Sequence, residues 1–492
     1  MKILSAVQIR EADLYTIQNE PVSSIDLMER AARACLDSII EICEKDNHFA
    51  ICCGNGNNGG DGLALARMLT QTGKKVTVFD FQLSSPSTDF TINLSRLKES
   101  RTEYIQCEKI SAEDFSGFDV IIDALFGTGL REPLRGKAVD VVRAMNGSGK
   151  KIIAIDLPSG LHADEFIGGE AVRANFTLTF QLPKLTFLFR ESYPYTGEWF
   201  VLDIGLDQEF IHAQHSEYEF ADAQFTKGLF KSRQRFSHKG DFGHSLIVAG
   251  SKGKIGAAIL AAGACLRTGA GLVTVHLPSC GANVMHSMYP ETMVDEDANS
   301  DFISEIPAGE KYTAIGIGPG IGTGEATVDA LIQFLRKTSK PIVLDADALN
   351  ILSANPGFLS EVPHNSILTP HPKEFDRLAG ESVDSFHRLK KQVEFSKVHK
   401  VIVVLKGAYT SVSLPDGKVY FNSTGNPALS KGGSGDVLTG MVTAFLSQRY
   451  SPAHSAILAT YLHGRAADKL VESRADFSVL ASDLIDQIGK TE

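Results

Sequence analysis

Apolar residues recur in two alternating patterns along this chain, and together they predict a mixed α/β protein. Short apolar runs at 49–53, 118–123 and 151–156 have the length and composition of buried parallel strands. Before the first of them, the stretches 5–19 and 25–44 carry apolar residues at helical spacing. The run 49–53 leads into a Gly-rich turn at 54–62 and a predicted helix at 63–72, and this succession is typical of a doubly wound α/β domain.

The same alternation starts again in the second half of the chain. Apolar runs at 244–250, 313–318 and 401–405 predict strands, and the run 341–347 predicts a strand that ends in two acids. The stretch 256–268 predicts a helix rich in small residues, which permits close approach to a sheet or a ligand. We therefore expect a second α/β domain.

The chain length also favours two domains, because 492 residues are too many for one hydrophobic core. Between the two halves, residues 211–235 show no clear strand pattern. We expect the boundary between 215 and 225, and therefore domains at 1–215 and 225–492.

Composition narrows the class of protein. The net charge is −11 without a long basic run, which argues against general binding of nucleic acid. The seven cysteines lack metal-ligand spacing and indicate reduced thiols in a cytoplasmic protein. No signal peptide or membrane span is expected.

Polar residues follow three predicted strands in the first half. Asn58 and Asp61 follow the first, Asp123 ends the second, and Asp156 and Ser159 follow the third. Each alone could be a helix cap or turn former. Because ligands of open α/β sheets bind beyond the carboxyl ends of the strands, we interpret them as one site. Amide, carboxylate and hydroxyl groups suit hydroxyl, amide or cation ligands.

The strongest chemical signal in the second half is the Gly-rich run 432–435, followed by Asp436 and an apolar helix at 437–446. Glycines and a helix start suit phosphate. Asp436 is then either a base that takes a proton from a hydroxyl or merely the helix N-cap. Lys406, at a strand end, is either a phosphate ligand or a solvated surface lysine. His371 is either a turn residue or a substrate contact.

The first half resembles the NAD(P)H-hydrate epimerase domain, a Rossmann-like fold. The resemblance covers about 1–215 and lies in the run 57–61, Asp123, the loop 127–133 and the run 156–160. It implies interconversion of the R and S forms of hydrated NADH and NADPH. It also implies a potassium ion held by Asn58, Asp123 and Ser159.

The same resemblance implies which residues contact the hydrate. Asp156 is the candidate for acid or base chemistry, or alternatively a ribose-binding carboxylate. The implied contacts are Asn57, Asn58, Gly59, Gly60, Asp61, Gly127, Thr128, Gly129, Leu130, Arg131, Glu132, Pro133 and Asp156.

The second half resembles NAD(P)H-hydrate dehydratase, a branch of the ribokinase-like fold, over about 225–492. In the fused two-domain form the resemblance implies ADP as phosphate donor, with Mg²⁺ bridging phosphates. It implies nucleotide contacts at Lys406, Gly407, Ala408, Tyr409, Thr410 and Gly435. It implies hydrate contacts at Ala257, Gly320, His371 and Asp436.

These resemblances imply one repair pathway. ADP phosphorylates the ring hydroxyl of the S hydrate, phosphate leaves, and NAD(P)H, AMP and phosphate result. The first domain makes the R hydrate usable. The alternative is a ribokinase-like kinase of a small alcohol with a non-catalytic N-terminal binding module. The expected partners are these small molecules, without nucleic acid or membrane, and a homo-oligomer is expected.

Overall fold

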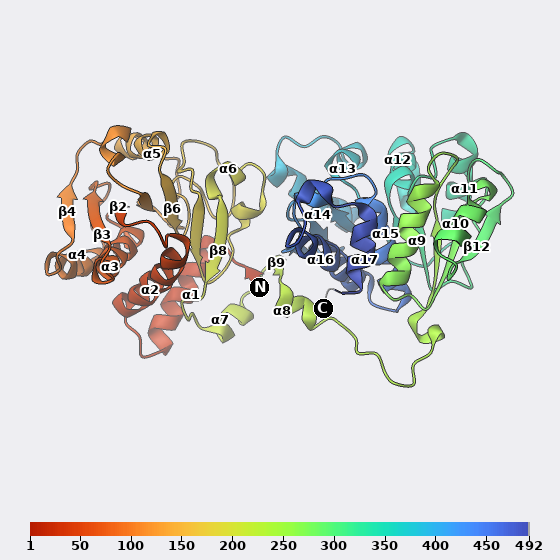
Figure 1. Ribbon diagram of the computed structural model, residues 1–492, viewed down its shortest axis with the longest axis horizontal. Coiled ribbons are helices and arrows are strands. Elements are labelled where there is room, and N and C mark those ends of the chain that lie inside the picture. Colours follow the sequence, from red (N-terminus) through yellow and green to blue (C-terminus); the bar gives the residue numbers. More distant parts are fainter. Residues whose placement is uncertain (491–492) are drawn as a thin grey trace. The chain divides into compact units, whose positions relative to one another are not determined.

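The computed structural model describes residues 1–490, and it divides the chain into two compact units. One comprises residues 2–216, and the other comprises Met1 and the described residues from 217 to 490. Figure 1 shows both as α/β folds, in red to yellow and in green to blue. Mixed α/β architecture with parallel sheets confirms the predicted fold class.

The N-terminal unit is built on a seven-stranded sheet in the order β4-β3-β2-β5-β6-β7-β8, and each described pairing is parallel. Its strands are β2 (His48–Cys53), β3 (Lys75–Asp80), β4 (Glu103–Gln106), β5 (Val120–Ala124), β6 (Lys151–Ile155), β7 (Phe176–Phe180) and β8 (Glu198–Leu202), and β1 (Lys2–Ile3) precedes them. Its helices are α1 (Ala6–Asn19), α2 (Ser24–Ile42), α3 (Asn57–Gln71), α4 (Thr88–Lys98), α5 (Lys137–Gly147), α6 (Tyr193–Thr196) and α7 (Gln208–Ala213), with 3₁₀ turns η1 (Ala112–Phe115) and η2 (Leu185–Leu188).

Successive side chains of a strand point to opposite faces, so both faces of this sheet need cover. On one face Phe49 and Ile51 of β2 pack in a core with α2 and α3. On the other face Ala50 and Cys52 pack in a core with α5. Figure 1 accordingly shows α3 and α5 on opposite sides of the sheet. This is the doubly wound arrangement that the apolar runs predict.

In the second unit the strand order from β9 onward is β9-β18-β17-β16-β15-β14-β13-β10-β11-β12. The described pairings are parallel, except that β17 runs antiparallel to both neighbours. The strands are β9 (Tyr218–Ala221), β10 (His244–Val248), β11 (Leu272–Pro278), β12 (Met293–Asp297), β13 (Ala314–Ile317), β14 (Val343–Leu344), β15 (Ile367–Leu368), β16 (Ile402–Leu405), β17 (Ser411–Ser413) and β18 (Val419–Asn422).

Helices again cover both faces of this sheet. The helices are α8 (Ala223–Lys227), α9 (Ile255–Arg267), α10 (Ala282–Met288), α11 (Glu325–Leu335), α12 (Ala346–Ala354), α13 (Pro372–Ala379), α14 (Ser385–His399), α15 (Ser434–Ser447), α16 (Pro452–Val471) and α17 (Ala481–Ile488). The 3₁₀ turns are η3 (Lys239–Phe242), η4 (Ser279–Gly281), η5 (Pro356–Glu361), η6 (Pro427–Leu429) and η7 (Asp476–Ser478).

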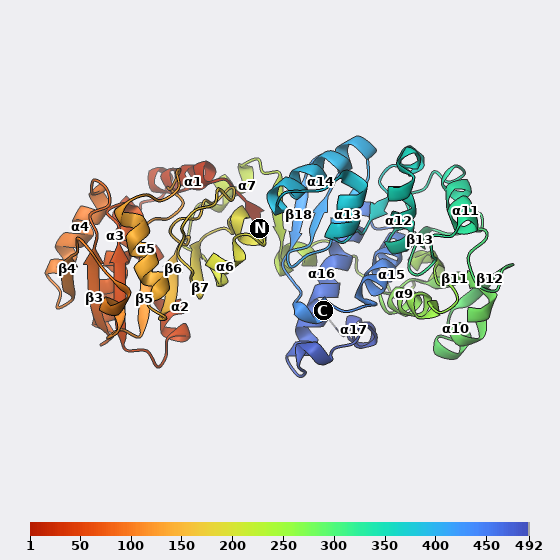
Figure 2. The ribbon, with the colours of Figure 1, turned by 90° about the horizontal axis from the view of Figure 1, so that it is seen from above.

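Two helices far apart in the sequence, α9 and α15, lie side by side in both views (Figures 1 and 2). Small residues permit this approach: a Cβ added to Gly440 would lie only 2.1 Å from the carbonyl oxygen of Ala261. Gly440 is on α15, which begins within the Gly-rich run 432–435. The tight contact therefore fixes where that turn begins.

Several local expectations are wrong in detail. Helix α3 begins at Asn57, not after the Gly-rich run, so residues 57–61 form its first turns. The run 341–347 contains only a two-residue strand, and Asp347 lies inside helix α12. Residues 211–235 contain β9, α8 and the end of α7. The last two errors have the same cause, since short elements carry too few residues for a clear period.

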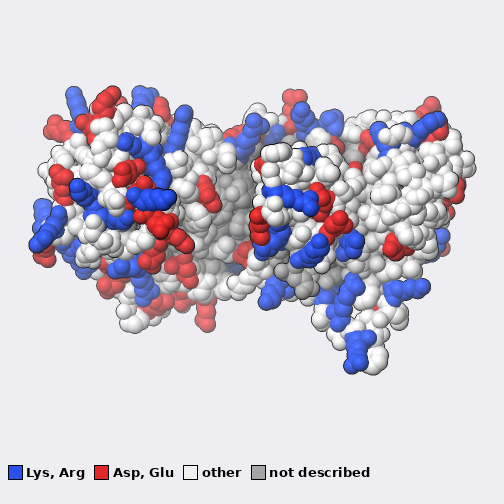
Figure 3. Space-filling view, in the orientation of Figure 1, with Lys and Arg blue, Asp and Glu red and all other residues white. Residues whose placement is uncertain are grey.

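The surface and the cysteines add two observations. On the face drawn in Figure 3, basic and acidic side chains are intermixed over both units. All seven cysteines are free, and Cys280 is exposed. Within residues 1–490, no helix combines the length and apolar character needed to cross a membrane.

Candidate functional site

The polar residues predicted in the first half lie at the carboxyl ends of three adjacent strands, β2, β5 and β6. Asp123 and Ser159 are in direct contact: the Ser159 hydroxyl donates to Asp123 Oδ1 at 2.6 Å, and its backbone N–H donates to Oδ2 at 2.8 Å. The backbone N–H of Leu125 also donates to Asp123 Oδ1, at 3.2 Å. The sheet order thus brings together residues 36 positions apart.

The potassium ion implied for this site is compatible with the residues present. Asp123 is fully buried, and burial raises its pKa to about 6 against three hydrogen bonds that lower it. No basic side chain of the described residues is among the groups that act on it. The side-chain Nδ2 of Asn58 is buried without a hydrogen-bond partner within residues 1–490. That nitrogen is a donor and cannot bind a cation, but the Asn58 Oδ1, the buried Asp123 carboxylate and the Ser159 hydroxyl are oxygen ligands that suit a monovalent cation.

Gly127 brings the loop 127–133 against the strand ends. A Cβ added at Gly127 would lie 2.9 Å from Asp156 Oδ2 and 3.3 Å from Asn58 Oδ1, so any larger residue would intrude between them. The backbone N–H of Thr128 donates to Asp156 Oδ2 at 3.1 Å. The loop and Asp156 therefore form one wall of the site.

Asp156 has a backbone conformation that a non-glycine residue rarely adopts, with φ at 65°. Such strain costs roughly 1–3 kcal/mol and persists where surrounding contacts enforce it, often at functional sites. Asp156 is 8% exposed, and it directly follows β6. Its strained backbone and buried carboxylate distinguish it from an ordinary turn aspartate.

The other predicted hydrate contacts differ in accessibility. Asn58, Gly59, Gly60 and Asp61 are buried in the first turns of α3, and Asn57 is exposed. In the loop, Gly129, Arg131 and Glu132 are exposed, whereas Gly127, Thr128, Leu130 and Pro133 are partly buried. The exposed members are thus open to a ligand.

Two ionisable residues of this site escaped the sequence analysis. Lys184, just beyond β7, places its Nζ 3.2 Å from Asp156 Oδ1. Asp13 comes from α1. Burial and then Asp156 raise the pKa of Asp13 to about 7, and Lys184 lowers it. The sequence offers only a weak signal for each residue. Lys184 comes four residues after the apolar run that forms β7, and Asp13 is one acid within an amphipathic helix.

Asp61 belongs to the same group of charges. Burial is the largest cause that raises its pKa well above the ordinary value, followed by Asp156, Asp13 and Asp89. The site therefore contains carboxyl groups in unequal environments. Groups of this kind can divide the work of an acid and a base between them.

In the second unit, the start of α15 has the geometry expected of a phosphate site. Gly433 is the residue before the helix, with φ at 94°, and Asp436 is the third residue of the helix. Asp436 is therefore not the N-cap. Burial and then Asp345 raise its pKa to about 7, Asp347 adds to this, and Lys406 opposes it. A carboxyl with a pKa near neutrality is suited to general-base catalysis.

Lys406 is neither free in solvent nor a residue without a partner. Its Nζ lies 3.0 Å from Asp345 Oδ1 and 3.9 Å from Glu374 Oε2. The Thr439 hydroxyl donates to Asp345 Oδ2 at 2.7 Å. A Cβ added at Gly435 would lie 3.5 Å from Lys406 Nζ, so two predicted nucleotide contacts adjoin one another. The segment 407–410 is a turn closed by a hydrogen bond from Gly407 N–H to the Thr410 hydroxyl, at 3.2 Å.

The predicted hydrate contacts Ala257 and Gly320 are also adjacent, because a Cβ at Gly320 would lie 3.1 Å from that of Ala257. Asp347 lies between this pair and Asp436. It accepts a hydrogen bond from Gly322 N–H at 2.9 Å and pairs with Lys254 at 3.4 Å. The same carboxylate acts electrostatically on Asp436. The structure therefore gathers these residues around one site.

His371 is a helix cap and is also open to a ligand. Its Nδ1 accepts a hydrogen bond from Glu374 N–H at 3.2 Å at the start of α13, and its side chain is 45% exposed. Burial is the main cause that lowers its pKa. A neutral ring with one nitrogen engaged leaves Nε2 near Glu374 Oε1, at 3.4 Å.

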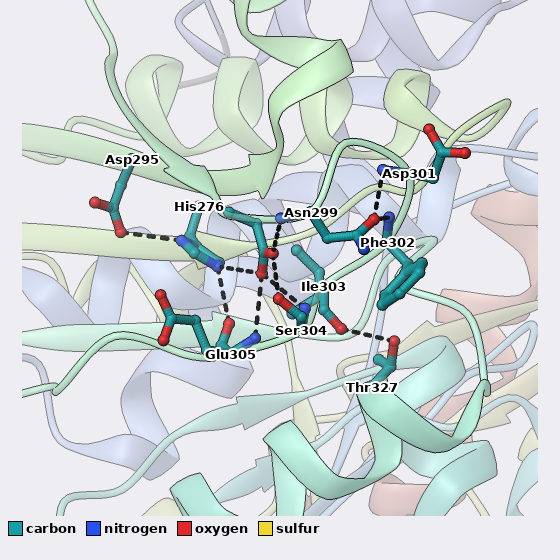
Figure 4. A network of polar contacts seen from close by, with 10 residues as sticks. His276, Asp295, Asn299, Asp301, Phe302, Ile303, Ser304, Glu305 and Thr327 are labelled. Atoms are coloured by element: carbon teal, nitrogen blue, oxygen red, sulfur yellow. Dashed lines mark hydrogen bonds and ion pairs between the residues drawn. The ribbon is translucent and has the colours of Figure 1, made fainter.

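A network centred on His276 also went unnoticed in the sequence (Figure 4). His276 Nδ1 lies 3.0 Å from Asp295, and its Nε2 lies 2.9 Å from the carbonyl of Glu305 and 3.3 Å from Asp297. Asp297 in turn accepts hydrogen bonds from Ser304 and from nearby backbone N–H groups. The network fixes the segment 297–305.

That segment is connected to the candidate hydrate site. The carbonyl of Asp301 accepts a hydrogen bond from Lys252 N–H at 2.8 Å, and its side chain pairs with Lys252 Nζ at 2.8 Å. The neighbouring Ser251 hydroxyl donates to the Gly320 carbonyl at 2.7 Å. The contact of Lys252 with Asp301 and that of Ser251 with Gly320 thus link the His276 network to Gly320.

Known proteins match both units. A family described as NAD(P)H-hydrate dehydratase matches residues 245–490, and one described as YjeF-related protein N-terminus matches residues 24–186. A ribokinase-like superfamily protein from Enterococcus faecalis V583 is 25% identical, with a TM-score of 0.50, and the match covers 56% of this chain and 96% of that one. The second unit thus has a ribokinase-like fold.

Full-length relatives carry one common description. The bifunctional NAD(P)H-hydrate repair enzyme Nnr of Moorella thermoacetica is 34% identical over 517 residues, which cover 99% of this chain and 96% of the relative. The protein of the same name from Escherichia coli K12 is 33% identical and covers 93% of this chain and 88% of its own length. The chain therefore belongs to the family of bifunctional NAD(P)H-hydrate repair enzymes.

Proposed function

We propose that this chain repairs hydrated nicotinamide cofactors in two steps. The N-terminal unit interconverts the R and S hydrates, and the second unit dehydrates the S hydrate to NAD(P)H with ADP. One observation carries the proposal: relatives named for this bifunctional repair align over nearly the whole chain. The grouping of polar residues within each unit supports it independently.

In the N-terminal unit, Asp156 is the residue that moves a proton to or from the hydrate. Its Oδ2 faces the loop 127–133, whose exposed members Gly129, Arg131 and Glu132 are free to contact the ligand. Asn58, Asp123 and Ser159 would hold a potassium ion, which would supply positive charge at this end of the sheet. The other residues position the hydrate and exclude water from it.

In the second unit, Asp436 takes the proton of the ring hydroxyl as that oxygen attacks the terminal phosphate of ADP. Backbone N–H groups at 432–435 stabilise the charge on the transferring group. AMP leaves in this transfer. Hydroxide is a poor leaving group and phosphate a good one, so the phosphorylated ring then loses phosphate and a ring proton to give NAD(P)H. Magnesium, when bound with the nucleotide, would offset the negative charge of its phosphates.

In this scheme the Lys406 ammonium has two possible partners, Asp345 and a phosphate of the nucleotide. Its ammonium now pairs with Asp345, which stands beside Gly435. A nucleotide phosphate at the Gly-rich run would compete with Asp345 for that ammonium. Lys406 therefore bridges the acidic group and the nucleotide, and Gly407, Ala408, Tyr409 and Thr410 shape the turn beside it.

A kinase of a small alcohol with a non-catalytic N-terminal module is not favoured. The first unit retains a strained aspartate and a buried group of carboxyls, which a scaffold does not need. Its relatives also align over both units under the name of a bifunctional enzyme.

The decisive experiment uses the mixed R and S hydrates. The intact protein is incubated with ADP or ATP, reduced nicotinamide absorbance is followed, and the residual hydrates are separated by chromatography. Both hydrates should be consumed, with AMP formed from ADP and higher rates with ADP than with ATP. A stable phosphate ester without NAD(P)H would favour the kinase instead.

Three expectations remain predictions with their own tests. Potassium dependence is measured by replacing K⁺ with Na⁺ in the epimerase assay. A homo-oligomer is tested by light scattering of the purified protein. A cytoplasmic location is tested by fractionation of the source cells.

A further inference from the structure

The Lys184 side chain is buried, and a buried ammonium costs free energy of folding unless its charge is paired. Its side chain is 0% exposed, and its Nζ donates to the carbonyls of Phe180 at 2.9 Å and Leu182 at 3.1 Å. The third neighbour is Asp156 Oδ1, at 3.2 Å. The two carbonyls accept hydrogen bonds from the ammonium, and the carboxylate forms an ion pair with it. Only one of these oxygens carries a formal charge.

The Asp156 carboxylate is held from two sides. Lys184, from the segment after β7, meets Oδ1, and Thr128 N–H, from the loop after β5, meets Oδ2 at 3.1 Å. The backbone of Asp156 is in the left-handed region. Two partners from different strands together fix both the position and the rotation of a carboxylate that its own backbone does not favour.

We propose that Lys184 is a positioning residue for epimerisation, which holds the Asp156 carboxylate so that Oδ2 faces the loop 127–133. This inference rests on the role proposed above for Asp156. Without the ammonium, Oδ1 loses its partner and the carboxylate can rotate away from the hydrate. A misplacement of about 1 Å can cost about 10²-fold in rate.

Three measurements on the intact protein test this role. Lys184→Met keeps the length of the side chain and removes its charge, and the assay is epimerisation of pure R hydrate. We expect kcat to fall about 10²-fold while KM changes less than about threefold, because positioning affects the reacting group more than binding. Dehydration of S hydrate by the same preparation should be unchanged. An epimerase kcat within about twofold of the parent in a folded Lys184→Met variant would overturn the proposal.

Lys151→Met is the matched control. Lys151 also ends in an ion pair, with Asp46 at 2.6 Å, but it lies at the start of β6, at the opposite end of that strand from Asp156. It should leave the epimerase kcat unchanged. An equal loss in both variants would indicate that removing any paired lysine damages this unit, and would overturn the specific role of Lys184.

A double-mutant comparison separates the inference from the role of Asp156. Asp156→Asn alone should abolish most epimerase activity, and adding Lys184→Met should cause no further loss. If Asp156→Asn remains active, the proposed role of Asp156 fails. If Asp156→Asn is inactive but Lys184→Met is not, the role of Lys184 alone fails. An additional large loss in the double variant would likewise show that Lys184 acts without Asp156.

Lys184→Arg decides the case if Lys184→Met does not fold. Arginine keeps the charge and can donate to both carbonyls, but its planar guanidinium cannot place a donor where the compact ammonium meets Oδ1. We expect a folded protein whose epimerase kcat is reduced about tenfold. A parental kcat in Lys184→Arg would indicate that Lys184 only satisfies the carbonyls of Phe180 and Leu182.

Discussion

At the scale of single residues, two aspartates occupy positions that destabilise the fold. Asp156 has a left-handed backbone, and Asp436 has a pKa raised to about 7 by burial and neighbouring acids. The sequence indicated both through the same reasoning, an acid at a strand end or a helix start where a ligand belongs. It could not indicate Lys184, because its contact with Asp156 joins two strand ends that only the folded sheet brings together.

Replacement of Asp436 tests its role as a base. Asp436→Asn keeps the shape of the side chain but cannot accept the hydroxyl proton. We expect dehydration of S hydrate to fall about 10²–10⁴-fold, the usual effect of removing a general base. ADP affinity, measured by calorimetry, and epimerisation of R hydrate should be nearly unchanged. Turnover within a few-fold of the parent would transfer the role of base to Asp345 or Asp347.

The raised pKa of Asp436 also predicts how stability depends on pH. The folded protein binds this proton up to about pH 7, because the pKa of the carboxyl is raised there, whereas the unfolded chain loses it near the ordinary pKa of 3.8. The resulting stabilisation is full below that value and is lost as the pH rises to about 7. Asp436→Asn should therefore raise the unfolding temperature at pH 8 but not at pH 4.

The matched control for this stability effect is Asp486→Asn, since the Asp486 side chain is 72% exposed. Its unfolding temperature should follow that of the parent at both pH values. A parallel response of Asp436→Asn and the parent would show that Asp436 is not protonated in the folded protein near pH 6.

Asp123 provides a third test at this scale. Asp123→Ala removes the buried carboxylate that binds Ser159 and, by our proposal, potassium. Epimerisation should fall and become less sensitive to exchange of K⁺ for Na⁺, while dehydration of S hydrate should persist. Loss of both activities in a folded protein would argue against separate sites.

At the scale of helices and strands, the sequence predicted which elements exist better than it predicted the residues at which they begin and end. The sequence predicts a loop in place of the first turns of α3, because Gly59, Gly60 and Gly62 disfavour helix on propensity alone. In the fold, a Cβ at Gly62 would lie 2.6 Å from that of Ala124, so packing against the sheet requires glycine. Tertiary contact therefore overrides propensity at the point where Asn58 and Asp61 enter the site.

The segment 297–305 allows a prediction at the same scale. His276→Ala leaves the buried Asp297 with one partner fewer, which costs about 1–3 kcal/mol and loosens the segment that holds Lys252. Because Lys252 adjoins the turn that contacts Gly320, we expect the KM for S hydrate to rise several-fold with a smaller change in kcat. Steady-state kinetics of dehydration measure both constants.

The control for His276 is Asp295→Asn. Asp295 contacts only the other ring nitrogen, and its side chain is 40% exposed, so its replacement should have little effect. A kcat that falls with an unchanged KM in His276→Ala would instead place the network in the reaction and not in substrate binding.

At the scale of the whole molecule, chain length and the restart of the strand-helix pattern predicted two α/β units. Each unit has its own sheet and its own apolar clusters. We therefore expect residues 1–216, expressed alone, to fold and to epimerise R hydrate without forming NAD(P)H. Chromatographic separation of the hydrates measures this. A fragment that folds but leaves R hydrate unchanged would support a non-catalytic module.

The union of two units in one polypeptide has a consequence for gene expression. Every round of translation yields one epimerase unit and one dehydratase unit, so promoter strength cannot alter their molar ratio. Under the proposed function, a cell could change the ratio of the epimerisation rate to the dehydration rate only through a co-substrate that one unit needs, such as the nucleotide. Starvation for that nucleotide would stop NAD(P)H recovery while R and S hydrates continued to interconvert.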